Sequence, residues 1–283
     1  MKKWARSIAS IARTTRSIGV FDSGFGGLAI LKSLVKEMPE YDYVYLGDTA
    51  RAPYGSRKKE DIDKFTEEGI KALFKKGAEL VIVACNSSSA DALRKIQHDY
   101  VPRRFPDRKV LGVLVPASEE AAFKTRNKKV GVMATEATVD SGAFERELGK
   151  IDPEIEVFQR ACPGLVPIVE AGEVKGEHLR EVVKMYAQPL VEQQVDTIIL
   201  GCTHYEFLAH IVNDIAPEIS VITEGELVAR KLKDYLGRHK EIVEKLTRGG
   251  RRNFYTTGAK DRFEKLGSQF FGGKIRAKEL QIS

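Results

Sequence analysis

The chain has 283 residues, of which 42% are hydrophobic and 30% are charged, and this composition excludes a disordered chain. No apolar run reaches the roughly 18 residues that a membrane-spanning helix needs, so a membrane span is not expected. The net charge of +6 is concentrated in a basic leader, residues 1–16, which contains Lys2, Lys3, Arg6, Arg13 and Arg16 but no acid. We expect this leader to be flexible. Because the remaining residues are almost balanced in charge, they lack the basic stripe of a nucleic-acid-binding protein.

The length favours two domains. Short runs of β-branched and aromatic residues, bounded by Gly, Asp, Asn or Pro, alternate with helical patterns from residue 17 onward. In the first half, the runs at 18–21, 43–46, 80–84 and 110–115 are predicted strands, and apolar residues recur at helical spacing over 28–38 and 62–74. This alternation predicts a parallel sheet with helices on both faces.

The pattern then begins again, with strands predicted at 129–134, 155–158, 197–200 and 219–222 and helices near 141–148, 178–194 and 205–215. A helix over 227–236 and a strand over 253–257 follow, and we expect this last part to return to the first unit. The sequence thus predicts an α/β protein of two similar domains, with the active site in the cleft between them. The first domain is assigned to 17–115 with 225–283, and the second to 116–224.

Four polar clusters follow predicted strands: Asp22-Ser23-Gly24, the loop 47–55, Cys85-Asn86-Ser87 and Cys202-Thr203-His204. Open α/β sheets bind ligands at the carboxyl ends of their strands, so these clusters are expected to converge. Gly24-x-Gly26-x-x-Ala29 with Asp48 formally matches a dinucleotide fingerprint, which leaves a nucleotide-dependent oxidoreductase as an alternative. Asp22 argues against that alternative, because its carboxylate would lie beside the pyrophosphate.

The cysteines are Cys85, Cys162 and Cys202, an odd number at wide spacing. This usage predicts neither a disulfide framework nor a metal site and is typical of the reducing cytoplasm. Inversion at a carbon needs a base on one face and an acid on the other, and a thiol with a reference pKa of about 8.5 suits both roles. Cys85 and Cys202, at matching strand ends, fit this chemistry, with His204 beside Cys202. An alternative outside the enzymes is a noncatalytic module that binds an amino acid without exchanging its α-proton.

Four segments together resemble glutamate racemase: V-F-D-S-G-F-G-G-L at 20–28, L-G-D-T-A-R-A-P-Y-G at 46–55, V-A-C-N-S-S-S-A at 83–90 and L-G-C-T-H-Y at 200–205. The similarity continues through 134–144 and 162–172 and covers roughly 17 to 230. It implies a two-base racemase, without cofactor or metal, that supplies D-glutamate for peptidoglycan. A racemase of aspartate or hydantoins from the same superfamily stays open as an alternative.

The resemblance also implies roles for individual residues. Cys85 would exchange the α-proton on the face of D-glutamate and Cys202 on the face of L-glutamate, assisted by Asp22, Glu170 and His204. The residues implied in substrate binding are Asp22, Ser23, Tyr54, Gly55, Asn86, Ser87, Thr138, Thr203 and His204. Cys162 lies outside the paired thiols and is expected to be structural.

The sequence departs from the family pattern at three places. Ser87 replaces a usual Thr, Glu206 replaces a Pro after C-T-H-Y, and residues 223–226 replace a commoner D-S-G-E-like turn. None of these changes removes a catalytic group. We expect a homodimer, and because some members carry an N-terminal extension linked to activation by a peptidoglycan precursor, such a precursor is a candidate regulator.

Overall fold

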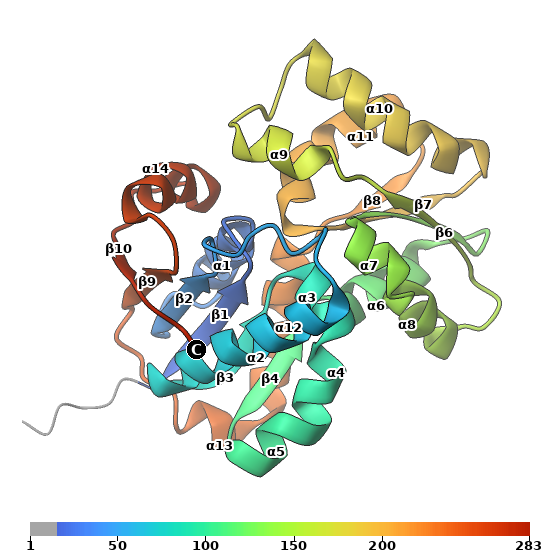
Figure 1. Cartoon of the computed structure of the whole chain (residues 1–283). Coiled ribbons are helices and arrows are strands. Elements are labelled where there is room, and N and C mark those ends of the chain that lie inside the picture. The colour runs from blue at the N-terminus through green and yellow to red at the C-terminus, as the bar shows by residue number, and fades with distance from the viewer. Residues whose placement is uncertain (1–15) are drawn as a thin grey trace, which may run out of the picture.

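The computed structural model describes residues 16–283, so the predicted leader, apart from Arg16, lies outside the described residues. The strands form two parallel sheets, one of six strands and one of four, with helices packed around both (Figure 1). This arrangement confirms the predicted α/β class with two helix-flanked parallel sheets. Among the described residues, no helix has the length and hydropathy needed to cross a membrane.

The six-stranded sheet has the order β10-β9-β2-β1-β3-β4, and all its strand pairs are parallel. Its strands are β1 (Ser17–Asp22), β2 (Tyr43–Gly47), β3 (Ala78–Val83), β4 (Lys109–Gly112), β9 (Arg252–Thr256) and β10 (Ala277–Glu279). The strand predicted at 253–257 is β9, which pairs with β2 and thus returns to the sheet formed by the first part of the chain.

Alternating side chains of this sheet enter two apolar cores. Ile18 and Val20 of β1 pack in the core on the side of α1 (Gly27–Glu37), α12 (Gly225–Arg238) and α14 (Lys260–Phe271). Phe21 packs in the other core, with Ile62 and Ile70 of α2 (Lys59–Lys75). Burial of each such side chain stabilises the fold by about 1.5–3 kcal/mol. Because the apolar side chains of a strand point alternately to the two faces, both faces of the sheet need helices to cover them.

The four-stranded sheet has the order β6-β5-β7-β8, again with parallel pairs. Its strands are β5 (Lys129–Ala134), β6 (Glu156–Ala161), β7 (Thr197–Gly201) and β8 (Ser220–Ile222). The helical segments between β4 and β8 are α6 (Leu114–Lys124), α7 (Glu136–Asp140), α8 (Ala143–Ile151), α9 (Leu165–Glu170), α10 (Glu177–Glu192), the 3₁₀ helix η2 (Thr203–Leu208) and α11 (Ala209–Ile215).

Three of the predicted boundaries that the structure corrects show why the sequence pattern misleads. The strand expected to reach residue 115 ends at Gly112, and α6 begins at Leu114. An unbroken apolar run suits both a strand and a buried helix start, so periodicity does not mark this change. The helix expected over 141–148 starts after Gly142, whose φ of +61° separates α7 from α8. The helix expected over 205–215 begins as 3₁₀ turns rather than α-helix.

Other segments lack an amphipathic pattern long enough to predict. After β3, the chain forms α3 (Asn86–Asp91), α4 (Leu93–Lys95), the π-helix η1 (Ile96–Tyr100) and α5 (Val101–Arg104). The short helix α13 (Lys240–Val243) follows α12. Helices of three to six residues give too few turns for a 3.6-residue period to emerge.

Candidate active site

A cavity of about 190 Å³ lies where carboxyl ends of the two sheets meet. Its walls include residues that follow β1, β3, β5 and β7. The strand order reverses between β1 and β3 in the six-stranded sheet and between β5 and β7 in the four-stranded sheet. Open α/β sheets bind their ligands at such points. Ten of the predicted site residues line it: Ser23, Tyr54, Gly55, Cys85, Asn86, Ser87, Glu170, Cys202, Thr203 and His204.

Cys85 lies at the end of β3 and is the N-cap residue of α3. Its side chain is 6% exposed, and its Sγ donates to Ser23 Oγ at 3.4 Å. Burial raises the pKa of the Cys85 thiol, and the charge of Asp22 raises it further, while hydrogen bonds with Ser23 and Ser88 oppose the shift. Cys85 is therefore held as a thiol at neutral pH.

Cys202 lies in the corresponding place after β7, as the N-cap residue of η2. It is 7% exposed, and its Sγ lies 3.8 Å from His204 Nδ1. Burial raises the pKa of Cys202 well above its usual range, although the backbone N–H of His204 favours the thiolate. The His204 imidazole is thus placed to exchange a proton with the Cys202 sulfur.

A chain of polar contacts leads from Cys202 to the surface. His204 Nε2 lies 3.2 Å from Glu170 Oε1, and Glu170 Oε2 lies 3.5 Å from Arg262 Nη2. Glu170 ends α9, whereas Arg262 belongs to α14, which packs on the other sheet. Residue patterns alone did not point to Arg262, because its contact depends on how α14 packs.

Asp22 ends β1 and is fully buried behind the cavity wall rather than in it. It accepts hydrogen bonds from Gly24 N at 2.8 Å and from Thr203 Oγ1 at 3.4 Å. Burial raises the pKa of Asp22, whereas the interaction with His204 and the backbone N–H groups of Gly24 and Gly27 lower it. Asp22 thereby places Ser23 and Thr203, both of which line the cavity.

Tyr54 closes another wall of the cavity, and its hydroxyl donates to Asp48. The buried Asp48 also accepts from Arg51 Nε at 2.7 Å and from Thr257 Oγ1 at 2.6 Å. Burial and, after it, the neighbouring Asp48 carboxylate raise the pKa of Tyr54, so its hydroxyl stays protonated. These contacts hold the loop 47–55 against the end of β9.

Thr138 is the one other predicted site residue that does not line the cavity. It is fully buried, and its Oγ1 lies 3.0 Å from Thr135 Oγ1. Thr135 does line the cavity, caps α7, and lies 3.0 Å from Ser87 Oγ. Sequence analysis did not single out Thr135, although its position directly after the predicted strand that became β5 was a signal that could have identified it.

Cys162 also lines the cavity. Its thiol donates to the carbonyl oxygen of Arg160 at 3.2 Å, and burial raises its pKa to about 12. The sulfur is therefore protonated, with its donor bonded to the backbone.

The glycines after β1 allow close packing, Gly26 against the end of the four-stranded sheet and Gly27 within the six-stranded sheet. A Cβ on Gly26 would lie 2.1 Å from Thr203 Oγ1, and one on Gly27 would lie 2.6 Å from Asp22 Cβ. A dinucleotide fingerprint needs these backbone atoms open to a pyrophosphate, so the packing argues against a nucleotide site here. Within residues 16–283, no cluster of three or more His, Cys, Asp and Glu side chains has the geometry to hold a metal ion.

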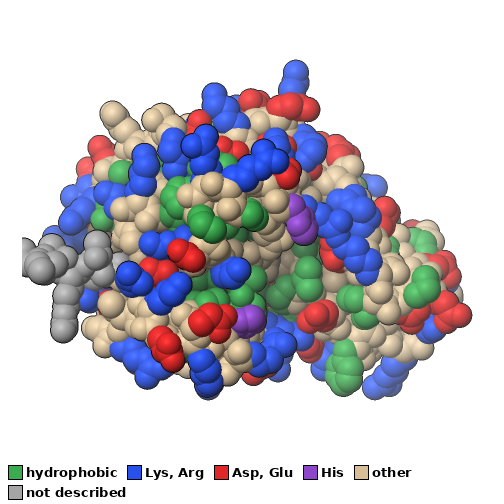
Figure 2. All heavy atoms as spheres, turned by 90° about the horizontal axis from the view of Figure 1, so that it is seen from below, with side chains coloured by type: hydrophobic (Ala, Val, Ile, Leu, Met, Phe, Trp, Pro, Cys, Tyr) green, Lys and Arg blue, Asp and Glu red, His purple; other side chains and the backbone are tan. Residues whose placement is uncertain are grey.

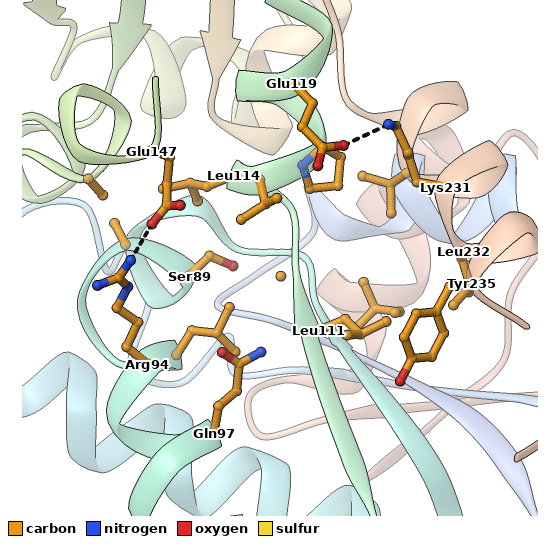
Figure 3. A pocket seen from close by; sticks show the side chains of 18 of the residues that line it. Ser89, Arg94, Gln97, Leu111, Leu114, Glu119, Glu147, Lys231, Leu232 and Tyr235 are labelled. Atoms are coloured by element: carbon orange, nitrogen blue, oxygen red, sulfur yellow. Dashed lines mark hydrogen bonds and ion pairs between the residues drawn. The ribbon is translucent and has the colours of Figure 1, made fainter. Parts of the chain in front are cut away.

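A second cavity, of about 500 Å³, shares no lining residue with the first. Figure 3 shows it between Arg94, which pairs with Glu147, and Lys231, which pairs with Glu119. The first pair joins α4 to α8 and the second joins α12 to α6. On the face shown in Figure 2, acidic and basic side chains are interspersed around a hollow with hydrophobic walls.

Comparison with known proteins identifies close relatives over almost the whole chain. Residues 18–232 match the Asp/Glu/Hydantoin racemase family. A glutamate racemase of Thermoanaerobacter pseudethanolicus is 38% identical over 92% of this chain and 95% of its own. Glutamate racemase structures from Bacillus anthracis and from Francisella tularensis, the latter with D-glutamate, have TM-scores of 0.86 and 0.84 at 30% and 31% identity. They cover 94% and 95% of this chain, and 97% and 98% of their own.

Proposed function

Because the chain belongs to the Asp/Glu/Hydantoin racemase family, we propose that it interconverts L- and D-glutamate, with Cys85 and Cys202 as the two acid–base groups. One observation carries the proposal. The two cysteines follow strands of different sheets, yet both line one cavity. The names of the relatives, which are glutamate racemases, support glutamate as the substrate.

In the proposed reaction, the Cys202 thiol passes its proton to His204, and the resulting thiolate takes the α-proton of L-glutamate. The C–H electron pair stays on the substrate as a carbanion, and the thiol of Cys85 gives its proton to the opposite face. D-glutamate leaves, with Cys202 as a thiol and Cys85 as a thiolate, and the reverse reaction or exchange with solvent restores the first state. Positioned groups of this kind contribute roughly 10²–10⁴ in rate.

The cavity environment supports these roles. Both thiols are nearly buried, which excludes water and strengthens electrostatic interactions with a bound substrate. The chain from His204 through Glu170 can exchange a proton with Cys202, while Asp22 acts on Cys85 through its charge. Backbone N–H groups of Asn86 and Thr203, which line the cavity, are proposed as donors to the carboxylate on which the carbanion charge develops, whereas the N–H of Gly24 is bonded to Asp22. The other residues predicted to bind the substrate are tested by measuring glutamate affinity in single variants, and each is expected to weaken it: Ser23, Tyr54, Gly55, Ser87 and Thr138.

Proton NMR with L-glutamate in D₂O, without added cofactor, tests the proposal. We expect the wild type to lose the α-proton signal as D-glutamate forms, and Cys85→Ser and Cys202→Ser to be slower by roughly 10²-fold or more. Cys162→Ser is the matched control, since this buried thiol lines the same cavity and should retain activity. Unchanged rates in the first two variants would refute the mechanism.

A substrate panel tests the alternatives. Exchange of aspartate in place of glutamate would assign the other racemase activity, and binding without exchange would indicate a noncatalytic module. A cysteine-independent change in nicotinamide absorbance would indicate an oxidoreductase.

The physiological setting follows from the proposed reaction. We infer a cytoplasmic enzyme that supplies D-glutamate for peptidoglycan and so for cell-wall and cell-shape maintenance. A homodimer and a peptidoglycan precursor as regulator stay predictions. Gel filtration with light scattering tests the dimer, and rate measurements with the precursor, on full-length and leader-trimmed protein, test the regulator.

A further inference from the structure

A hydrogen bond between Asn86 and Glu224 joins the two halves of the molecule behind the cavity. Asn86 begins α3 directly after Cys85, and Glu224 lies between β8 and α12, in the segment that departs from the expected D-S-G-E-like turn. Asn86 Nδ2 donates to Glu224 Oε2 at 2.8 Å. Both side chains are 2% exposed, so water does not compete for this bond.

Each partner keeps one buried oxygen without a hydrogen-bond partner among the described residues, namely Asn86 Oδ1 and Glu224 Oε1. Leaving a buried polar atom unsatisfied is unfavourable, and the cost is greater for a charged carboxylate. A protonated carboxyl carries a hydroxyl donor, and Asn86 Oδ1 is an acceptor. A single proton on Glu224 Oε1 therefore gives both oxygens a hydrogen-bond partner, because the resulting hydroxyl can donate to Asn86 Oδ1.

The groups that face Glu224 favour this proton. Glu206 of η2, Asp22 at the end of β1 and Cys202 at the end of β7 all interact with it electrostatically, and each is an acid. The pKa of Glu224 is raised to about 8, mainly by burial; the charges of Glu206 and Asp22 add to the rise, and the hydrogen bond from Asn86 opposes it. The carboxyl is thus mostly neutral at pH 7.

We propose that Glu224 is a protonated positioning residue, which forms an acid–amide pair with Asn86 through two hydrogen bonds. The pair holds the start of α3, and with it Cys85, against the turn that follows β8. An amide nitrogen carries two hydrogens, so the pair leaves one Nδ2 hydrogen and the backbone N–H of Asn86 for a ligand. Only the kinetic consequence rests on the proposed function, because the pair exists in the resting protein.

The protonation state is tested by ¹³C NMR of protein labelled at glutamate carboxyl carbons. The Glu224 signal is identified by its absence in Glu224→Gln. We expect that signal to be that of a neutral acid at pH 7, with a titration midpoint near pH 8. Glu226→Gln is the control, because this exposed carboxylate pairs with Lys36 and its loss should leave the Glu224 signal unchanged. A Glu224 signal that is ionised at pH 7 would overturn the proposal, whether or not the protein racemises glutamate.

Kinetics test the positioning role. Gln at 224 can donate to Asn86 Oδ1 and accept from its Nδ2, so we expect Glu224→Gln to keep kcat/KM within about threefold at pH 7 and to lose less activity than the wild type above the pKa of Glu224. Glu224→Ala leaves both groups of Asn86 unpaired, and we expect a loss of about tenfold or more, a barrier change of about 1.4 kcal/mol. Equal losses in the two variants, or none in Glu224→Ala, would overturn the role. Should Glu224→Ala not fold, the NMR titration and the pH profile of Glu224→Gln decide.

Discussion

Thr203 Oγ1 lies 3.4 Å from Asp22 Oδ1, so a side chain that follows β7 contacts the buried carboxyl that ends β1. This contact joins the four-stranded sheet to the six-stranded sheet directly beside the proposed catalytic thiols. Gly26 makes the approach possible, because a Cβ there would lie 2.1 Å from Thr203 Oγ1 and 2.8 Å from His204 Nδ1. The relative placement of the two sheets at the cavity therefore depends on a few side chains.

Gly26→Ala should reduce both activity and stability. The added methyl group must displace Thr203 or His204, and overpacking of this kind lowers the free energy of unfolding by about 1–3 kcal/mol. Because both displaced residues line the cavity, we also expect kcat/KM to fall by about tenfold or more. Gly149→Ala is the control: nothing lies within 4 Å of its Cβ position in α8, so helix propensity should stabilise it by about 0.5–1 kcal/mol. A fully active Gly26→Ala enzyme would contradict this interpretation.

Thr203→Val should weaken the reaction through Asp22. Valine keeps the shape of threonine but removes the hydroxyl that donates to the carboxylate, so the pKa of Asp22 should rise further. We expect kcat/KM to fall by about tenfold and its acidic limb to move to higher pH. Thr203→Ser restores the donor and should recover most of the activity. An unshifted pH profile in the valine variant would show that the hydroxyl does not act through Asp22.

Glu170→Gln should slow racemisation in both directions by the same factor. The substitution replaces the carboxylate oxygen that lies 3.2 Å from His204 Nε2 with an amide group, so Glu170 can no longer take part in proton transfer through His204. The two enantiomers of glutamate have equal free energies, so kcat/KM must change equally from either side, and we expect about a tenfold loss. Circular dichroism of the reaction from each enantiomer measures it.

Arg262→Ala is the comparison for Glu170. Arg262 is largely exposed, and exposed pairs contribute about 0–1 kcal/mol, so its loss should cost about fivefold at most. A larger loss of kcat/KM in Arg262→Ala than in Glu170→Gln would contradict a role for Glu170 in proton transfer through His204.

Asp42→Asn should destabilise the fold in a pH-dependent way. The buried Asp42 accepts from Thr247 Oγ1 at 2.6 Å and from Arg251 N at 2.8 Å. Burial opposes its ionisation, but these hydrogen bonds and the Arg251 charge outweigh burial, so its pKa is lowered. The stabilisation is thus present above the unfolded-state pKa of about 3.9 and is lost as pH falls through the lower folded-state value. Urea unfolding should give a cost of about 1–3 kcal/mol at pH 7 that shrinks below pH 4. A cost independent of pH would contradict the assignment.

Much of the fold could be predicted because its strands are short, β-branched and bounded by turn residues. The proximity of Asp22 and Cys85 could be predicted for the same reason, since the carboxyl ends of parallel strands share an edge. Cys202 joins them because the carboxyl ends of the two sheets meet at one cavity. Periodicity failed where helices are very short, as from Asn86 to Arg104, and where one apolar run serves a strand and a helix, as at Val113.

The remaining parts of the site depend on tertiary packing. Glu224 and Arg262 come from elements distant in sequence from their partners, Asn86 and Glu170. Contacts between residues so far apart in the sequence cannot be predicted from a local sequence pattern. Whether a polar residue after a strand lines the cavity or lies behind it, as with Thr135 and Thr138, is decided by the turn geometry at the helix cap.

The burial of Cys85 and Cys202 also turns them into reporters of internal motion. A small alkylating reagent can reach these sulfurs only when the walls around them separate, since they are 6% and 7% exposed. At high reagent concentration, the rate of modification no longer depends on the reagent and equals the frequency of that opening. A substrate has to pass the same way, so this frequency sets an upper limit on how fast the molecule can work.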